Sequence, residues 1–280
     1  MSKQLFLLLS LPFFCFCQTT AIKNDLQKED LLGNVKQVKQ GCYEAKEKFG
    51  EVIQGDRKNS DKENYLKIYN EKGNKVEWFI YVWGGEKYQK HVYKYIDSLD
   101  KMEDNLYRPD GSLDWKYIYK YDDNGNQTEE NWYAPNGSLC RNGSYKYDDK
   151  GNLVEEKYYN ADGNLECKYI YKYDNAANRN EEGKYNASDY ILWKRAYKYD
   201  DKKNLIESTE YKTNGRLKLN IIYKYDDKGN VIEKNEYKPD GNLENRKTYM
   251  YEYDKTGNWV KKICKEGKAC IMLIREIEYY

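Results

Sequence analysis

Short runs of alternating polar and apolar residues follow one another along most of the chain, and clusters of Asp, Asn and Gly separate them. Residues 145–147, 153–159 and 165–173 alternate in this way, and turn-forming residues fill 148–152 and 160–164 between them. Alternation with a period of two is typical of β-strands, and Asp-Gly or Gly-Asn between two such runs is typical of tight hairpin turns. The pattern predicts units of two antiparallel strands and two tight turns.

The unit recurs every 26 residues around the motif Tyr-Lys-Tyr-Asp-x-x-Gly-Asn. A fixed period of this size is the signature of a repeat array. We expect an all-β fold of tandem 26-residue β-hairpin repeats, with roughly 16–18 strands in an extended antiparallel meander that is twisted or partly rolled. The second tyrosine of the motif, or its equivalent by spacing, stands at Tyr43, Tyr69, Tyr95, Tyr121, Tyr147, Tyr173, Tyr199, Tyr225 and, after a step of 28, Tyr253.

The two faces of the predicted sheet differ in composition, because residues two apart in a strand share a face. Tyr117, Tyr119 and Tyr121 share one face, whereas Ile118 and Lys120 lie on the other. We expect tyrosine columns to pack against each other, and lysine and glutamate columns to alternate as opposite charges. In the second strand of each unit a glutamate recurs at the same step, at Glu129, Glu155, Glu181, Glu207 and Glu233.

The first residues resemble an export signal. The apolar stretch 5–16 follows Lys3, and Cys15 and Cys17 place small residues at the −3 and −1 positions before Gln18. Because this stretch is too short to span a bilayer, we expect 1–17 to be a signal peptide cleaved after Cys17, and we expect no transmembrane segment. The predicted protein is therefore periplasmic, on the outer surface or extracellular.

A lipid anchor at Cys15 or Cys17 is the less favoured alternative, because bulky phenylalanines precede both cysteines. Residues 18–42 form a predicted N-terminal capping segment, and the repeat domain covers 43–280. Within the capping segment, 24–33 has the composition of a short helix with a glycine stop. We expect this helix to cover the first edge strand of the sheet.

Composition narrows the class of function. The formal net charge is +1, and the charged residues, 34% of the chain, are mixed in sign. A nucleic-acid-binding protein needs a basic surplus, so that class is disfavoured. The 32 tyrosines bring the aromatic fraction to 16%, which opposes disorder. Tyrosine suits a half-buried strand because its ring packs while its hydroxyl reaches water.

Few residues indicate catalytic or metal chemistry. Cys264 and Cys270 flank a predicted turn, so a disulfide across two strands is expected there. The Asp-Asp-x-Gly-Asn clusters are explained by the needs of tight turns rather than by calcium. His91 is the only histidine, and a structural role is expected for it. We predict no cofactor, no metal site, no catalytic residue and no enzymatic activity.

Tryptophans interrupt the repeat pattern, and departures from a repeat are where a binding site is expected. Flat aromatic rings present apolar faces to sugars, although most of the tyrosines are expected to pack the sheet. Trp259 also interrupts the pattern. The candidate ligand-binding residues are Trp78, Trp83, Trp115, Trp132 and Trp193.

The chain resembles a known repeat family. Tyr-Lys-Tyr-Asp-Asp-Lys-Gly-Asn at 145–152 and 223–230, with Asp-Gly-Asn-Leu at 162–165 and 240–243, resembles the tyrosine–aspartate (YD) repeats of Rhs-type proteins. The whole chain is similar to short secreted YD-repeat proteins of the Bacteroidetes, and the resemblance covers about 43–280. In large Rhs toxins and teneurins such repeats wind into a β-shell, and short members are described as surface or sugar-binding proteins.

These observations predict an exported, non-enzymatic binding module at the surface or in the periplasm. A carbohydrate, such as a cell-surface glycan, is the leading ligand class. The first alternative is a protein-interaction or structural element, such as an adhesin, a partner of an envelope protein or a partner in a toxin system. The last alternative is a glycoside hydrolase, which needs a pocket with two carboxylates about 5–9 Å apart.

Overall fold

The computed structural model describes residues 23–58, 63–82, 87–96 and 100–280. It contains one short helix, α1 (Asp25–Lys28), and 19 strands. The strands are β1 (Val35–Lys48), β2 (Glu51–Arg57), β3 (Tyr65–Tyr69), β4 (Lys75–Tyr81), β5 (Lys87–Ile96), β6 (Asp100–Tyr107), β7 (Leu113–Tyr121), β8 (Gln127–Tyr133), β9 (Leu139–Tyr147) and β10 (Leu153–Asn160). They continue with β11 (Leu165–Tyr173), β12 (Arg179–Asn186), β13 (Ile191–Tyr199), β14 (Leu205–Tyr211), β15 (Leu217–Tyr225), β16 (Val231–Tyr237), β17 (Leu243–Tyr253), β18 (Trp259–Glu266) and β19 (Ala269–Tyr279).

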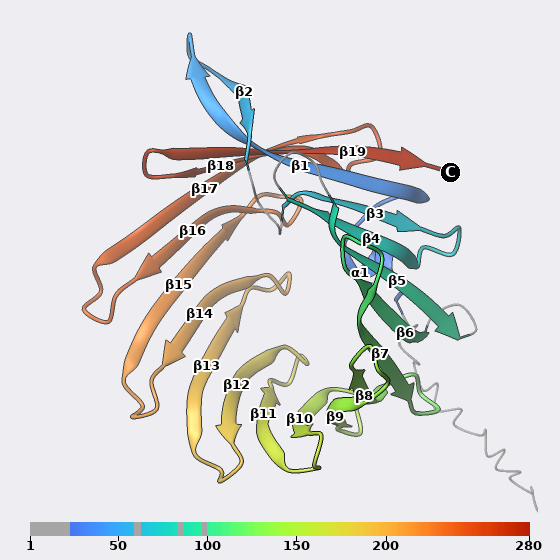
Figure 1. The fold of residues 1–280 in the computed structure, drawn as a ribbon. Coiled ribbons are helices and arrows are strands. Elements are labelled where there is room, and N and C mark those ends of the chain that lie inside the picture. Colours follow the sequence, from blue (N-terminus) through green and yellow to red (C-terminus); the bar gives the residue numbers. More distant parts are fainter. Residues whose placement is uncertain (1–22, 59–62, 83–86, 97–99) are drawn as a thin grey trace, which may run out of the picture.

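The sheet closes on itself as an antiparallel barrel. Strands β3 to β19 each pair with the next one along the chain, and β1 pairs with β3 on one side and β19 on the other. Only β2 lies outside this ring, paired with the far half of β1, so 18 of the 19 strands form the barrel. Figure 1 shows the ring of strands and the β1–β2 hairpin projecting from it. The predicted antiparallel meander is confirmed, and it is fully closed rather than partly rolled.

β-Bulges explain the curvature of the sheet. In the hairpin of β7 and β8, Lys120 pairs with Glu129 and Tyr121 with Gln127, so one extra residue lies in β8 directly after the turn. A bulge at the corresponding place occurs in every hairpin from β3 to β18, at both ends of the barrel. Because each bulge bends its strand and increases the local twist, the repeated bulges roll the meander into a closed ring.

Aspartates of the motif stabilise the turns. The Asp148 carboxylate accepts the backbone N–H groups of Lys150 and Asn152, at 3.0 and 2.8 Å. Gly151 adopts a positive φ of 80°, a conformation that suits glycine. Ala177 occupies the equivalent place in its own turn with φ of 60°. The carboxylates thus bond within their own turns, which is the role expected from the sequence.

Ala177→Gly is expected to stabilise the protein by about 0.5–1 kcal/mol. Relief of the left-handed strain, about 1–2 kcal/mol, exceeds the entropy that glycine adds to the unfolded chain. Chemical denaturation of residues 18–280 measures the change. Gly151→Ala, which meets no atom within 4 Å, is the reverse control and should destabilise the protein. If both substitutions changed the free energy of unfolding in the same direction, this account of the turns would be contradicted.

Lysine–glutamate pairs cover the outer face of the barrel. Their Nζ–Oε distances are 2.6 Å for Lys120–Glu129, 2.8 Å for Lys172–Glu181 and 2.9 Å for Lys224–Glu233. The lysines of this column are 57–70% exposed, which marks this face as the convex one. The predicted columns of alternating charge are confirmed, and the tyrosines occupy the inner face.

One of these glutamates makes stability dependent on pH. Burial would raise the pKa of Glu103, but hydrogen bonds from Lys116, Lys94 and Asn105 outweigh it and lower the pKa to about 2 from 4.5. A depressed pKa contributes stability above pH 4.5 and loses it as the pH falls toward 2. We expect the free energy of unfolding to decrease in this range, and to decrease less in Glu103→Gln.

The measurement is chemical denaturation at several pH values. Glu244→Gln is the control, because Glu244 is exposed and forms no ion pair with the described residues. An identical pH profile for Glu103→Gln and the unsubstituted protein would contradict the assignment.

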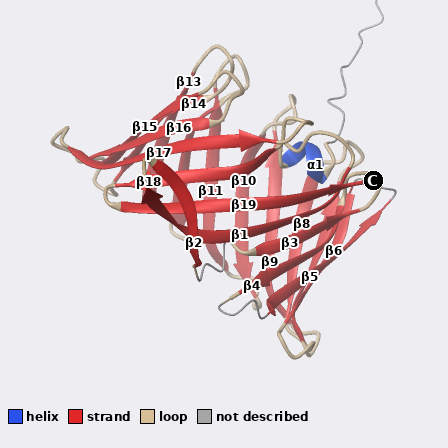
Figure 2. Ribbon diagram, turned by 90° about the horizontal axis from the view of Figure 1, so that it is seen from above, coloured by secondary structure: helices blue, strands red, loops and turns tan. Residues whose placement is uncertain are grey.

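The helix α1 lies near one end of the barrel (Figure 2). It faces the tyrosines, since the Tyr69 and Tyr95 hydroxyls donate to Glu29 and Asp25. Its start is a capping box, in which the Asn24 and Gln27 side chains bond to each other's backbone N–H groups. Leu26 and the following Leu31 pack with Val35, Val38, Tyr65 and Tyr69 in the buried apolar core. The predicted helix is thus shorter than 24–33, and it covers no edge strand because pairing of β1 with β19 leaves no edge there.

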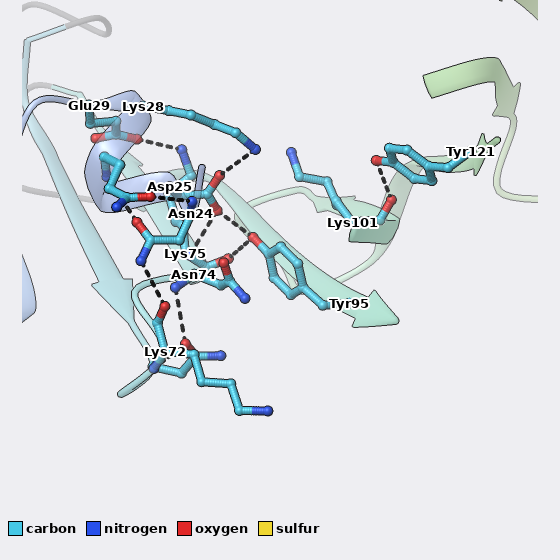
Figure 3. A network of polar contacts seen from close by, with 12 residues as sticks. Asn24, Asp25, Lys28, Glu29, Lys72, Asn74, Lys75, Tyr95, Lys101 and Tyr121 are labelled. Atoms are coloured by element: carbon cyan, nitrogen blue, oxygen red, sulfur yellow. Dashed lines mark hydrogen bonds and ion pairs between the residues drawn. The ribbon is translucent and has the colours of Figure 1, made fainter. Parts of the chain in front are cut away.

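Polar contacts fix α1 to the inner wall (Figure 3). Glu29 pairs with Lys67 and Lys75, at 2.6 and 2.9 Å, and Asp25 accepts the Tyr95 hydroxyl at 2.6 Å. Burial would raise the pKa of Glu29, but the charges of Lys75 and Lys67 outweigh it and lower the pKa. No helix in the described ranges is long and apolar enough to cross a membrane.

The expected disulfide is absent. Cys264 pairs with Ile271 and Cys270 with Lys265, so the two thiols point to opposite faces of the sheet and both are free. The prediction was wrong because the sequence does not show the register of the β18–β19 hairpin, and a shift of one residue moves a side chain to the other face.

Candidate functional site

The inner wall of the barrel is a lattice of tyrosines whose hydroxyls bond to the protein. In two repeats the first tyrosine of the motif donates to a glutamate 15 residues earlier: Tyr145 to Glu130 at 2.6 Å and Tyr171 to Glu156 at 2.9 Å. Burial, and then these hydrogen bonds and negative charges, raise the pKa of Tyr145 and of Tyr171. The expectation that tyrosine hydroxyls face water is corrected for Tyr145 and Tyr171, because the hydroxyl of each donates to a glutamate of the inner wall.

The second tyrosine of the motif links successive repeats. Its hydroxyl donates to the backbone carbonyl 20 residues earlier, on the first residue of the neighbouring strand, next to the bulge. Because the repeats share this bond, each bulge is held by a side chain from the next strand. The pairs are Tyr95–Lys75, Tyr121–Lys101 (where Lys101 is the second residue of β6), Tyr147–Gln127, Tyr173–Leu153, Tyr199–Arg179 and Tyr225–Leu205. In the last repeat Tyr251 makes the equivalent bond to Val231, and the Tyr253 hydroxyl donates to Asp226 instead.

Tyr173→Phe is expected to reduce the free energy of unfolding by about 1 kcal/mol, because it removes only the hydroxyl that bonds to the Leu153 carbonyl at 2.8 Å. Tyr190→Phe is the matched control, since the Tyr190 side chain is exposed. Denaturant unfolding compares the two variants. Equal stability of both variants would show that this hydrogen bond contributes nothing measurable.

Four of the five candidate tryptophans lie on the inner face, and none of the four is exposed. Trp132 meets Tyr117 edge to face at 5.4 Å between ring centroids, and Trp193 meets Tyr169 at 6.1 Å. Trp115 pairs with Leu106 on the same face. Trp83 lies outside the described residues.

Trp132 and Trp193 belong to one continuous series of contacts across β7–β13, which we call the aromatic belt. Arg141 links Trp132 to Tyr158, with its Cζ atom 5.0 and 4.4 Å from the two ring centroids. Such contacts hold a cation by the ring face, and Arg141 also pairs through Nε with Glu166 at 3.0 Å. The belt consists of Tyr117, Trp132, Arg141, Tyr158, Tyr169, Trp193 and Arg195.

Trp78 is separate from the belt and has a structural role. It packs against the α1 core and stacks on His91, with 5.0 Å between ring centroids. His91 in turn contacts the Asp104 carboxylate through Nδ1 at 3.0 Å and stacks on Tyr93. This environment agrees with the structural role expected for His91.

A cavity of about 600 Å³ lies between the segment after α1 and the inner wall at β16–β19. Arg275 stacks on Trp259, with its Cζ atom 3.5 Å from a ring centroid, and Lys228 Nζ lies 3.5 Å from that of Tyr253. The principal lining residues are Glu29, Asp30, Lys228, Asn230, Tyr253, Asn258, Trp259 and Arg275. Aromatic rings and cations thus meet around an open volume.

The orientation of Arg275 is fixed by neutral partners. Its Nε donates to Gln40 Oε1 at 2.9 Å and its Nη2 to the Tyr65 hydroxyl at 3.1 Å. Neither Arg275 nor Lys228 forms an ion pair within the described ranges. Nearby, burial and then the charge of Arg275 lower the pKa of Lys262, which stacks on Tyr249 and Tyr251. Arg275 and Lys228 thus bring two positive charges to the cavity without a direct ion pair to a described carboxylate.

Sequence reasoning found only part of this cavity. The sequence indicates Trp259, which interrupts the repeat. Arg275 and Lys228 were missed, because one is a single cation in a strand without a motif and the other occupies a variable turn position. Their proximity depends on closure of the barrel, which brings β19 beside β1 and α1.

Comparisons with known proteins give only remote likenesses. No protein-family model matches the chain, and no curated protein matches it. Among solved structures, a porin-like protein from Bacteroides uniformis has 10% identity and a TM-score of 0.45, with 87% of this chain and 98% of that chain covered. A porin-like protein from Bacteroides vulgatus has 10% identity and a TM-score of 0.37, with 88% and 99% covered.

The TcdB2-TccC3 structure without its hypervariable C-terminal region is also similar, with 10% identity and a TM-score of 0.27. The match covers 85% of this chain but 17% of that much longer chain.

Proposed function

We propose that the protein is an exported, non-enzymatic binding module whose ligand is a carbohydrate bound at the inner face of the barrel. The observation that carries the proposal is the meeting of aromatic rings and stacked cations in the aromatic belt and around the 600 Å³ cavity. Aromatic faces stack on the apolar faces of sugars, while Arg and Asn side chains bond to hydroxyl groups.

The charge state of the cavity supports binding rather than hydrolysis. A glycoside hydrolase needs a carboxylic acid whose pKa is raised so that it donates a proton. Glu29 has the opposite property, because Lys75 and Lys67 lower its pKa and hold it ionised. The outer face supports an aqueous location, since columns of Lys and Glu cover it where contact with lipid requires an apolar band.

The test is a glycan-array screen of residues 18–280, followed by tryptophan fluorescence with each saccharide that binds. We expect binding that shifts tryptophan emission and weakens by about tenfold in Trp259→Ala, because a stacked ring is lost. Trp115→Phe is a comparison variant outside the belt and the cavity, and should bind as the unsubstituted protein does. A clean negative on the array would overturn the carbohydrate proposal.

The projecting β1–β2 hairpin favours a second candidate function, the binding of a protein partner. β2 pairs with β1 on one edge and with no other described strand, and Phe49 at the tip is 96% exposed. A free strand edge binds an extended segment of another chain by strand addition. Cross-linking in the native envelope, with Val52→Pro to block the edge, tests this candidate; unchanged cross-links would contradict it.

A further inference from the structure

We infer that the cavity between α1 and β16–β19 binds an acidic saccharide, a uronic acid whose carboxylate is held by Arg275 and Lys228. The inference rests on the proposed carbohydrate-binding function and adds the charge of the ligand and the place where it binds.

Arg275 is arranged to receive a carboxylate. A guanidinium has five N–H donors, and the Gln40 and Tyr65 oxygens occupy two of them. Stacking on Trp259 at 3.5 Å fixes the plane of the group. Because the guanidinium is already oriented and has no carboxylate partner among the described residues, an incoming carboxylate gains bidentate hydrogen bonds at little entropic cost.

Lys228 supplies a second positive charge to the lining of the cavity. Its Nζ lies over the Tyr253 ring at 3.5 Å, and the Tyr253 hydroxyl is fixed by Asn230 and Asp226. The ammonium group therefore has a defined place without an anionic partner in the described part of the chain. Two such cations at one cavity favour an anionic ligand over a neutral one.

The remaining lining favours a sugar rather than a simple anion. Glu29 is neutralised by Lys67 and Lys75, so it does not repel the ligand strongly. Asp30 is exposed and forms no ion pair in the described ranges, and its oxygens are acceptors for sugar hydroxyls. A cavity of about 600 Å³ is of the size of small-molecule sites, and much larger than an inorganic anion requires.

The experiment is calorimetric titration of residues 18–280 with a galacturonate trisaccharide and, as a matched neutral probe, with its methyl ester. We expect the acid to bind at least about tenfold more tightly than the ester, and this preference to shrink with added salt. Arg275→Gln and Lys228→Gln should each remove most of the preference.

A loss of binding in Arg275→Gln could come from misfolding, because Arg275 also bonds to Gln40 and Tyr65. Lys228→Gln is the safer test, because Lys228 is exposed in a turn. Arg246→Gln is the control on the outer face and should leave binding unchanged, since Arg246 pairs with Glu233 there. Equal binding of acid and ester would overturn the inference while leaving the carbohydrate proposal standing. If both cavity variants still bind the acid as tightly as the unsubstituted protein, the assigned site is wrong. If neither probe binds and the glycan array is also negative, both proposals are overturned.

Discussion

Antiparallel pairing of β1 with β19 is the interaction on which the rest of the molecule depends. A meander of similar hairpins leaves two edges with unpaired N–H and C=O groups. Here the pairs from Val35–Tyr279 to Glu44–Ile271 join the first and last ring strands, and the bulges beside the turns bend the sheet so that they meet. Closure makes the two faces unequal, because side chains crowd together on the inner face and spread apart on the outer one.

Tyrosines pack the inner face of the barrel, because the chain has few large aliphatic residues to do so. Its ring supplies apolar contact, and its hydroxyl bonds to a glutamate or to the carbonyl beside a bulge. Several inner cations, such as Lys262 and Arg275, are held by ring faces instead of carboxylates. The wall is therefore ordered and polar at the same time, which is a suitable surface for a hydroxyl-rich ligand.

The cavity forms where the repeats end and the segment after α1 meets the last strands. The segment after α1 contributes Glu29 and Asp30, and the last strand contributes Arg275. Asn258 joins the two. Its Oδ1 accepts the Leu32 N–H and its Nδ2 donates to the Leu32 carbonyl, each at 2.8 Å, and Nδ2 also donates to the Tyr279 hydroxyl of the last strand at 2.8 Å. A site built in this way uses the irregular ends of the array, whereas the regular repeats between them serve as the wall.

The sequence by itself determined the strands, the turns and the two faces of the repeated strands, because alternation with period two and the positions of Asp, Gly and Asn act over a few residues. It also determined the Lys–Glu columns, since stacking of identical units repeats each contact. Tertiary structure alone decided that the ring closes, that α1 lies inside, that Cys264 and Cys270 face apart, and that Arg275 meets Trp259. These features depend on register and on summed curvature over 18 strands, to which each local pattern contributes only a small part.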